Sequence, residues 1–164
     1  KEKIKSAYFS KFPNIWHHGD YIQKTTNGGF VIHGRSDATL NPGGVRIGTA
    51  EIYRQVESFD EIEESVVVGQ SFDNDIRIVL FVKMNMNFDL TDELTQKIKS
   101  SIKNNCSPRH VPSIILKCPD VPKTKSGKVV EIAVRMLLNG EEVNNLESIA
   151  NPECLKYFRN IGKA

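Results

Sequence analysis

Two periodicities divide the chain into predicted strands and helices. Short runs of apolar, largely β-branched residues predict three strands, at 64–69, 76–84 and 114–117. Apolar residues that recur every three or four positions predict helices with one buried face, at 49–58, 91–104 and 129–138. A last short helix is predicted to begin at Asn151-Pro152. Because strands and helices alternate from residue 49 onward, we expect a small α/β or α+β domain.

A β-hairpin is predicted before this domain. Tyr21-Ile22 and Gly29–His33 are rich in β-forming residues, and Thr25-Thr26-Asn27-Gly28 joins them. Asn-Gly between two such runs is a strong hairpin signal, because both residues accept the backbone angles of a tight turn. Residues 1–18 predict only a short amphipathic segment. Arg77 and Lys83, within the strand at 76–84, are expected to face solvent.

The composition narrows the class of protein. The 164 residues are enough for one good core, and 39% hydrophobic with 26% charged residues is typical of a soluble globular chain. With 22 basic and 20 acidic residues, the net charge of +2 does not favour a nucleic-acid partner. No apolar run approaches the roughly 20 residues of a membrane-spanning helix. We therefore expect a cytoplasmic protein with no nucleic-acid and no membrane partner.

No metal site is predicted. Cys106, Cys118 and Cys154 are widely spaced and lack the C-x-x-C pattern of zinc or redox pairs. His17 and His18 are adjacent, so on a strand they would point to opposite faces and share a metal poorly.

A stretch that contains both glycine and arginine, residues 34–53, follows the predicted hairpin. It turns through Asn41-Pro42-Gly43-Gly44 before it enters a helix, and Arg35 and Arg46 flank the turn. Fixed cations beside a glycine-rich bend suit phosphate recognition. For this pattern alone, an ordinary hairpin whose charges point into water is the alternative.

Two further places could carry chemistry. Asp20 follows an apolar run and a glycine, where a carboxylate can accept hydrogen bonds from vicinal hydroxyls, although Asp is also common in turns. Residues 122–128, Pro-Lys-Thr-Lys-Ser-Gly-Lys, end in a Gly-Lys pair but have neither the first glycine nor the final Ser or Thr of a Walker phosphate loop. A basic surface loop is the alternative for this segment.

Taken together, these segments resemble three ordered motifs of adenylate-forming enzymes, the family of acyl-CoA synthetases, luciferases and nonribosomal-peptide adenylation domains. The matching segments are aromatic-x-x-Gly-Asp at 16–20, Gly-Arg-x-Asp at 34–37 with its continuation to Tyr53, and Pro-Lys-Thr-x-Ser-Gly-Lys at 122–128. The continuation to Tyr53 is most similar to the branch of the family that activates acetoacetate. The resemblance implies an α+β fold, with a small mixed sheet and flanking helices.

The resemblance also implies a division of the chain. Residues 1–36 would be the tail of a large N-terminal nucleotide-binding domain, and residues 37–164 would be a mobile C-terminal domain hinged at Asp37. The chain starts without Met, which fits the expectation of a fragment whose partner is its own N-terminal domain.

Roles in the first half-reaction follow from the resemblance. Lys128 would bind the substrate carboxylate and the α-phosphate of ATP, because a positioned ammonium offsets the repulsion between the two anions. Asp20 would bind the ribose hydroxyls of ATP, assisted by Arg35. Mg2+ would be held mainly by the missing N-terminal domain.

Roles in the second half-reaction are implied in the same way. After the small domain has turned about its hinge, Gly43 and Gly44 would face the pantetheine tunnel of coenzyme A. Arg46 would contact phosphate or the incoming CoA, and Lys103 and Arg109 are candidates for the CoA 3′-phosphate.

The implied reaction is acid–thiol ligation in ketone-body utilisation and lipid metabolism. Acetoacetate or another short acid reacts with ATP to give an acyl-adenylate and pyrophosphate, and CoA then displaces AMP. Ala38 stands where acetyl-CoA synthetases usually have a second carboxylate, which argues against acetate. The acyl pocket would lie upstream, so this chain alone is not expected to catalyse the complete reaction. A stand-alone nucleotide- or CoA-binding module and an interaction domain with Lys128 as an acetylation target are the alternatives.

Overall fold

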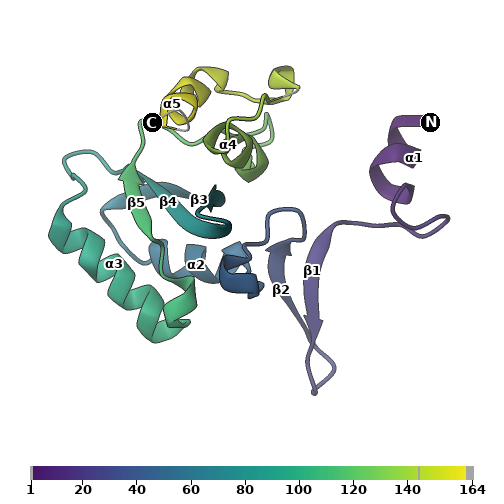
Figure 1. Ribbon diagram of the computed structural model, residues 1–164, viewed down its shortest axis with the longest axis horizontal. Coiled ribbons are helices and arrows are strands. Elements are labelled where there is room, and N and C mark those ends of the chain that lie inside the picture. The colour runs from purple at the N-terminus through teal and green to yellow at the C-terminus, as the bar shows by residue number, and fades with distance from the viewer. Residues whose placement is uncertain (1, 144, 162–164) are drawn as a thin grey trace.

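The computed structural model describes residues 2–143 and 145–161 (Figure 1). In chain order the helices and strands are α1 (Glu2–Phe9), β1 (Asp20–Lys24), β2 (Phe30–Arg35), α2 (Thr49–Val56), β3 (Ile62–Phe72), β4 (Asp75–Met84), α3 (Asp92–Asn105), β5 (Ile114–Lys117), α4 (Glu131–Leu138) and α5 (Leu155–Ile161). Every strand and helix predicted after residue 48 is present, with bounds that differ by a few residues.

Strands β3, β4 and β5 form one three-stranded sheet with β4 in the middle. β3 runs antiparallel to β4, with Val67 opposite Leu80, and β5 runs parallel to β4, with Ile114 opposite Val79. The predicted α+β fold with a small mixed sheet is therefore confirmed.

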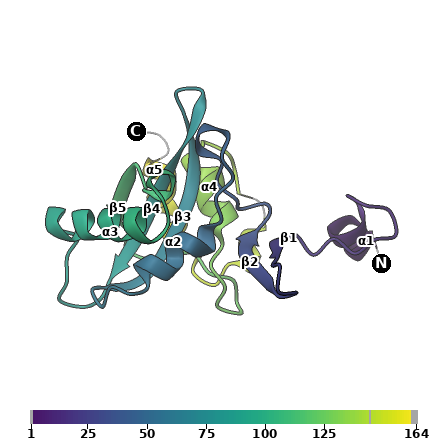
Figure 2. The same cartoon turned by 90° about the horizontal axis from the view of Figure 1, so that it is seen from below.

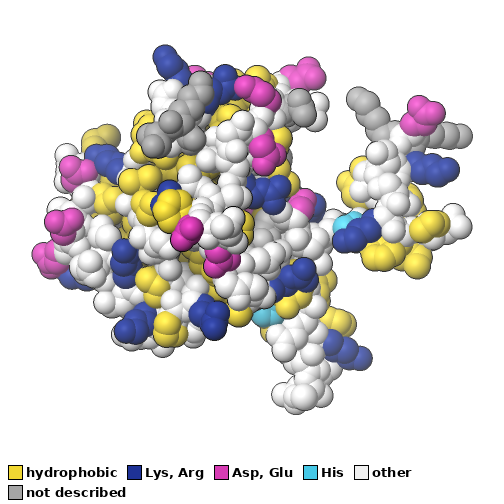
Figure 3. Space-filling view, viewed as in Figure 1, with side chains coloured by type: hydrophobic (Ala, Val, Ile, Leu, Met, Phe, Trp, Pro, Cys, Tyr) yellow, Lys and Arg dark blue, Asp and Glu magenta, His cyan; other side chains and the backbone are white. Residues whose placement is uncertain are grey.

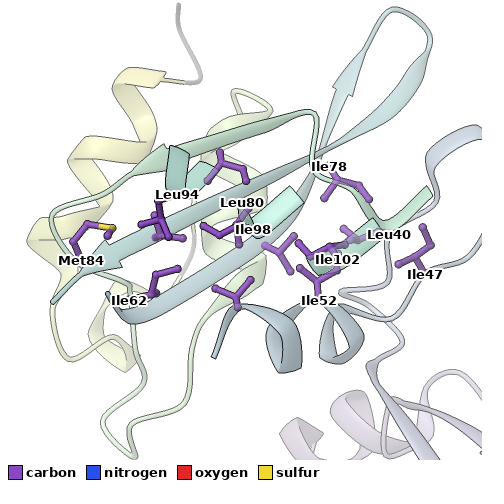
Figure 4. Packing of buried hydrophobic residues seen from close by; sticks show 14 residues of the cluster. Leu40, Ile47, Ile52, Ile62, Ile78, Leu80, Met84, Leu94, Ile98 and Ile102 are labelled. Atoms are coloured by element: carbon purple, nitrogen blue, oxygen red, sulfur yellow. The ribbon is translucent and has the colours of Figure 1, made fainter. Parts of the chain in front are cut away.

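Helices cover both faces of this sheet (Figures 1 and 2). Because successive strand residues point to opposite faces, Val67 and Leu80 pack with α2 and α3, whereas Val66 and Phe81 pack with α4 and α5. Figure 4 shows the first of these two cores, in which Ile52 of α2 lies with side chains of α3 and the sheet. Burial on both faces explains the nearly continuous apolar sequence of β4.

The β3–β4 hairpin is longer than predicted, and its turn is shorter. Residues 71–75, which are polar except for Phe72, indicate a five-residue turn, yet Phe72 pairs with Asp75 and only Asp73 and Asn74 turn the chain. Both have a positive φ, of 50° and 59°, which suits the tight turns that match strand twist. Ser71 and Asp75, although polar, thus continue the pairing of β3 with β4.

Lys83 does not simply face solvent, so that prediction is wrong. Its Nζ lies 2.9 Å from Glu63 Oε1 and 3.1 Å from Asp120 Oδ1, and its side chain is 24% exposed. Arg77 is half-buried and stacks at 4.0 Å over the ring of Phe72. The partners of Lys83 come from two distant segments, which the local sequence pattern does not reveal.

The N-terminal part projects from this three-layer body (Figures 1 and 3). β1 and β2 form the predicted hairpin as a separate antiparallel pair, and α1 precedes it. Large apolar side chains stay exposed on this part, namely Ile4, Phe12, Ile15, Trp16, Ile22, Phe30 and Ile32. Among the described residues, no helix has both the length and the apolar character needed to cross a membrane.

Candidate functional site

Arg35, at the end of β2, is the centre of the first group of charged residues. Its guanidinium donates to Asp37 through Nε and NH2, both at 3.1 Å, and to the carbonyl oxygen of His18 at 3.0 Å. Asp20 Oδ1 lies 3.9 Å from Arg35 NH1, and Asp20 Oδ2 is hydrogen-bonded to the ring of His18. Asp20 from one predicted motif and Arg35 with Asp37 from another are therefore in one cluster.

The pKa values in this cluster follow from the pairing. The hydrogen bonds to Asp37 raise the pKa of Arg35 above its usual range, against the effect of burial. Burial alone would raise the pKa of Asp37, but the hydrogen bonds and charge of Arg35 outweigh it, so this pKa is lowered. Both groups are held in their charged forms.

The backbone at Asp37 is also fixed by α4. Its carbonyl oxygen accepts a hydrogen bond of 2.8 Å from Arg135 NH1. The predicted hinge residue is thus bound on one side by the hairpin and on the other by the helix that follows the lysine segment.

Residues 123–129 form a small hairpin, which we call the lysine hairpin. Lys123 pairs with Val129, and Thr124 N donates to Lys128 O at 2.8 Å. Gly127 has a φ of +81° and donates to Thr124 O, so a three-residue turn with a left-handed glycine places Lys128 beside its tip. Because Val129 pairs in this hairpin, α4 begins at Glu131 rather than at the predicted Val129.

A hollow of about 310 Å³ lies between the cluster around Arg35 and the lysine hairpin. Arg35, Asp37 and Lys128 line it together, with Glu131 and the apolar side chain of Ile132. Lys128 is exposed, and within the described residues its ammonium makes no ion pair. The hollow therefore presents a free cation beside the predicted hinge, which suits an anionic ligand.

Glu131 forms the inner wall of this hollow. Tyr53 Oη donates to Glu131 Oε1 at 2.5 Å and accepts from Val67 N at 3.1 Å. Burial raises the pKa of Glu131 above its ordinary value, and the hydrogen bond from Tyr53 offsets only part of that rise. The hydroxyl of Tyr53 thereby joins α4 to α2 and to the sheet.

The turn at Gly43-Gly44 belongs to a second group. Gly43 and Gly44 have φ of 55° and 73°, and Gly43 N donates to both carboxylate oxygens of Asp75 at 3.0 Å. A Cβ on Gly43 would lie 3.3 Å from Arg109 NH1. Arg46 is exposed and stacks at 5.3 Å over the ring of Tyr21.

Comparison with known proteins shows which proteins the chain is similar to. No protein-family model matches the chain. It is 54% identical over 159 residues to an acetoacetyl-coenzyme A synthetase of Rhizobium meliloti, which covers 97% of this chain and 24% of that protein. It is 47% identical to acetoacetyl-CoA synthetase of Xenopus tropicalis, again over 97% of this chain and 24% of that protein. The solved acetoacetyl-CoA synthetase of Streptomyces lividans superposes with a TM-score of 0.88 and 39% identity, over 99% of this chain and 25% of that one.

Nearly the whole chain is similar to one part of these acetoacetyl-CoA synthetases. It spans about a quarter of the length of the curated relatives it matches. The resemblance predicted from the sequence is confirmed.

Most of the predicted site residues fall into two groups. Asp20, Arg35, Asp37 and Lys128 surround or adjoin the hollow, whereas Gly43, Gly44 and Arg109 lie together at the glycine turn. Lys103 is exposed on α3, and within the described residues it makes no hydrogen bond or ion pair to either group.

Sequence reasoning missed residues that hold the adenylate-forming motif together. At Gly48, a Cβ would lie 2.3 Å from the carbonyl oxygen of His33, so only glycine allows β2 and α2 to approach. Glu51 is hydrogen-bonded to both His33 and His110. Glu51 lies within the recognised motif, but its partners are 18 and 59 residues away in sequence, so local spacing gave no signal.

Proposed function

We propose that this chain is the mobile C-terminal part of an acetoacetate–CoA ligase. The complete enzyme would convert acetoacetate, ATP and CoA to acetoacetyl-CoA, AMP and pyrophosphate through an acyl-adenylate. The observation that carries this proposal is the free ammonium of Lys128 on the rim of the hollow shared with Arg35 and Asp37. The names of the relatives support the choice of acetoacetate.

In the first half-reaction, a carboxylate oxygen of the acid attacks the α-phosphorus of ATP and the bond to pyrophosphate breaks. Both reactants are anions, so a cation that reaches them lowers the barrier as negative charge moves to the leaving group. Lys128 fits this role because no carboxylate of the described chain neutralises it. Asp20 and Arg35 would hold the ribose, in the cluster beside the hollow.

In the second half-reaction, the CoA thiol attacks the acyl carbon and AMP leaves. We assign Gly43 and Gly44 to the pantetheine path, since their exposed turn has no side chains to obstruct a narrow ligand. Arg109 beside this turn or Lys103 on α3 would meet the 3′-phosphate of CoA, and Arg46 would contact phosphate or the incoming CoA.

The division at residue 36 is part of the proposal. The exposed apolar side chains of α1 and the β1–β2 hairpin form surfaces of the kind that a larger domain covers. Residues 1–36 would belong to that N-terminal domain, and residues 37–164 would turn about Asp37. The ion pair between Arg35 and Asp37 crosses the proposed boundary.

The remaining assignments concern cofactors and location. Among the described residues, no group of three or more His, Cys, Asp and Glu side chains is arranged to hold a metal ion. From the resemblance, we propose that Mg2+ is held mainly by the part of the enzyme that precedes this chain. We further propose a cytoplasmic enzyme of ketone-body utilisation and lipid metabolism.

The test uses the full-length enzyme and measures its two half-reactions separately. Lys128→Ala should lower acetoacetate-dependent exchange of pyrophosphate into ATP by roughly 10²- to 10³-fold, the usual loss for one charge-stabilising group. The rate of thioester formation from supplied acetoacetyl-adenylate should stay within about three-fold of that of the unmodified enzyme, because that step requires no adenylation.

Lys125→Ala is the matched control, since Lys125 is exposed on the same turn. Unchanged adenylation in Lys128→Ala would refute the proposal. A panel of short acids assayed with the unmodified enzyme tests the substrate, and a higher kcat/KM for any acid other than acetoacetate would overturn that assignment.

A further inference from the structure

A cluster of ion pairs lies under the lysine hairpin, on the edge of the sheet. We call it the anchor cluster, and its members are Glu63, Glu64, Lys83, Asp120 and Lys123. Lys83 is bonded to Glu63 and Asp120 at 2.9 and 3.1 Å, and it lies 3.8 Å from Glu64. Glu64 Oε1 forms an ion pair with Lys123 Nζ. Three carboxylates thus surround two ammonium groups, and these five side chains come from β3, β4 and the segment before α4.

The pair between Glu64 and Lys123 is partly buried. The Glu64 side chain is 23% exposed and that of Lys123 is 30% exposed. Glu64 Oε2 is buried and has no hydrogen-bond partner among the described residues, and Lys83 Nζ lies 3.8 Å from it. A partly buried carboxylate costs free energy unless cations neutralise it, so the ion pair with Glu64 holds the side chain of Lys123 in place.

The backbone of the hairpin is fixed at the same residue. Lys123 N donates to Asn151 Oδ1 at 2.9 Å, and Lys123 O accepts from Ala150 N at 2.8 Å. Asn151 also donates to Asp120 Oδ2 at 2.5 Å. The first strand of the hairpin is therefore held by the anchor cluster on one side and by residues 150–151 on the other.

Lys123 and Lys128 point into different hollows. Lys123 lines one of about 260 Å³ together with Glu64 and Tyr53, whereas Lys128 lines the hollow with Arg35 and Asp37. Both lysines belong to one basic motif, but within the described residues Lys123 is paired with Glu64 whereas Lys128 makes no ion pair. In the same part of the chain, the ammonium of Lys123 makes no ion pair with Asp20 or Asp37.

We propose that Glu64 and Lys123 are positioning residues that set the location of the Lys128 ammonium for adenylation. This inference rests on the proposed function. The connection is short: Lys123 pairs with Val129, and Thr124 bonds to the backbone of Lys128 at both N and O. A shift of the first strand therefore moves Lys128 directly. Displacement of a catalytic group by about 1 Å can cost on the order of 10²-fold in rate.

The experiment again uses the full-length enzyme and its two half-reactions. Lys123→Gln and Glu64→Gln should each lower kcat for pyrophosphate exchange by roughly 10- to 100-fold, with KM for ATP within about three-fold. Thioester formation from supplied acetoacetyl-adenylate should change by less than about three-fold, which also shows that the variant is folded. Lys123→Arg keeps the charge and should recover most of the lost adenylation rate.

A double variant tests whether the two residues act through one contact. Glu64→Gln combined with Lys123→Gln should be no slower than the slower single variant, because the contact can be lost only once. Lys125→Gln, on the exposed tip of the hairpin, is the matched control and should retain the adenylation rate.

Three results would overturn the inference. Unchanged adenylation in Lys123→Gln, in an enzyme that Lys128→Ala inactivates, would reject the positioning role and leave the proposed function intact. An equal loss in both half-reactions would show that Lys123 serves stability only. No loss in Lys128→Ala itself would reject the proposed function, and the inference with it.

Discussion

At the scale of single residues, Glu51 joins segments that are far apart in sequence. His33 of β2 lies 3.0 Å from Glu51 Oε1, and His110, which follows α3, lies 2.5 Å from Oε2. Burial would raise the pKa of Glu51, but the hydrogen bonds and charges of His110 and His33 outweigh it, so this pKa lies below its ordinary value of 4.5. One ionised carboxylate thus connects β2, α2 and the turn after α3.

This lowered pKa predicts how stability changes with pH. As the pH falls below 4.5, the unfolded chain takes up the proton of Glu51 before the folded chain does, so the stabilisation present above pH 4.5 is lost. Glu51→Gln should lower the free energy of unfolding at pH 7 by roughly 1 kcal/mol, a low value because the site is partly exposed. The difference from the unmodified chain should shrink as the pH falls toward 3.

Urea unfolding at a series of pH values measures this difference. Glu141→Gln, at an exposed carboxylate without an ion pair among the described residues, should follow the unmodified chain throughout. A difference between Glu51→Gln and the unmodified chain that stays constant with pH would show that Glu51 does not titrate differently in the folded state.

At the scale of elements, the hydrophobic periodicity predicted most of the fold, because the strands and helices bury their apolar residues in two cores on the faces of the sheet. Val66, Val67 and Val68 indicate a buried strand, and their alternate burial against two helical layers confirms it. The prediction was wrong in two places. The polar composition of 71–75 suggested a five-residue turn, but the pairing of Phe72 with Asp75 leaves only two residues in it. Lys83 is neutralised by carboxylates from segments that no local pattern connects.

The lysine hairpin gives a prediction at this scale. Gly127 has a φ of +81° and no neighbouring atom within 4 Å of a Cβ, so a substitution meets backbone strain but no steric clash. In the full-length enzyme, Gly127→Ala should destabilise the turn by roughly 1 kcal/mol and slow adenylation. Gly127→Asn should be milder, because asparagine tolerates the left-handed conformation. Pyrophosphate exchange compares the two, and equal losses would show that the side chain rather than the backbone is responsible.

At the scale of the whole molecule, the sequence motifs indicated the candidate site residues but not their grouping in space. Asp20, Arg35 and Lys128 are spread over more than half of the chain, yet they meet at or beside one hollow. Arg109 approaches Gly43 only because the chain after α3 returns to the glycine turn. Spacing along the chain carries no information on such returns, which depend on how the two helical layers pack on the sheet. Lys103 shows the converse, since within the described residues it makes no hydrogen bond or ion pair with the other candidates.

The proposed rotation about Asp37 gives the last prediction. Proline fixes φ near −65°, so Asp37→Pro in the full-length enzyme should hinder rotation at this residue. Thioester formation should fall by roughly ten-fold or more, while adenylation stays within about three-fold, because only the second half-reaction requires the turned domain. Asp37→Ala is the matched control, since it removes the carboxylate that pairs with Arg35 but leaves φ free. If both variants slowed thioester formation equally, the ion pair with Arg35 would account for the effect, and the hinge would have to lie elsewhere. Single-turnover measurement of each half-reaction separates these outcomes, because it reports the chemical steps without product release.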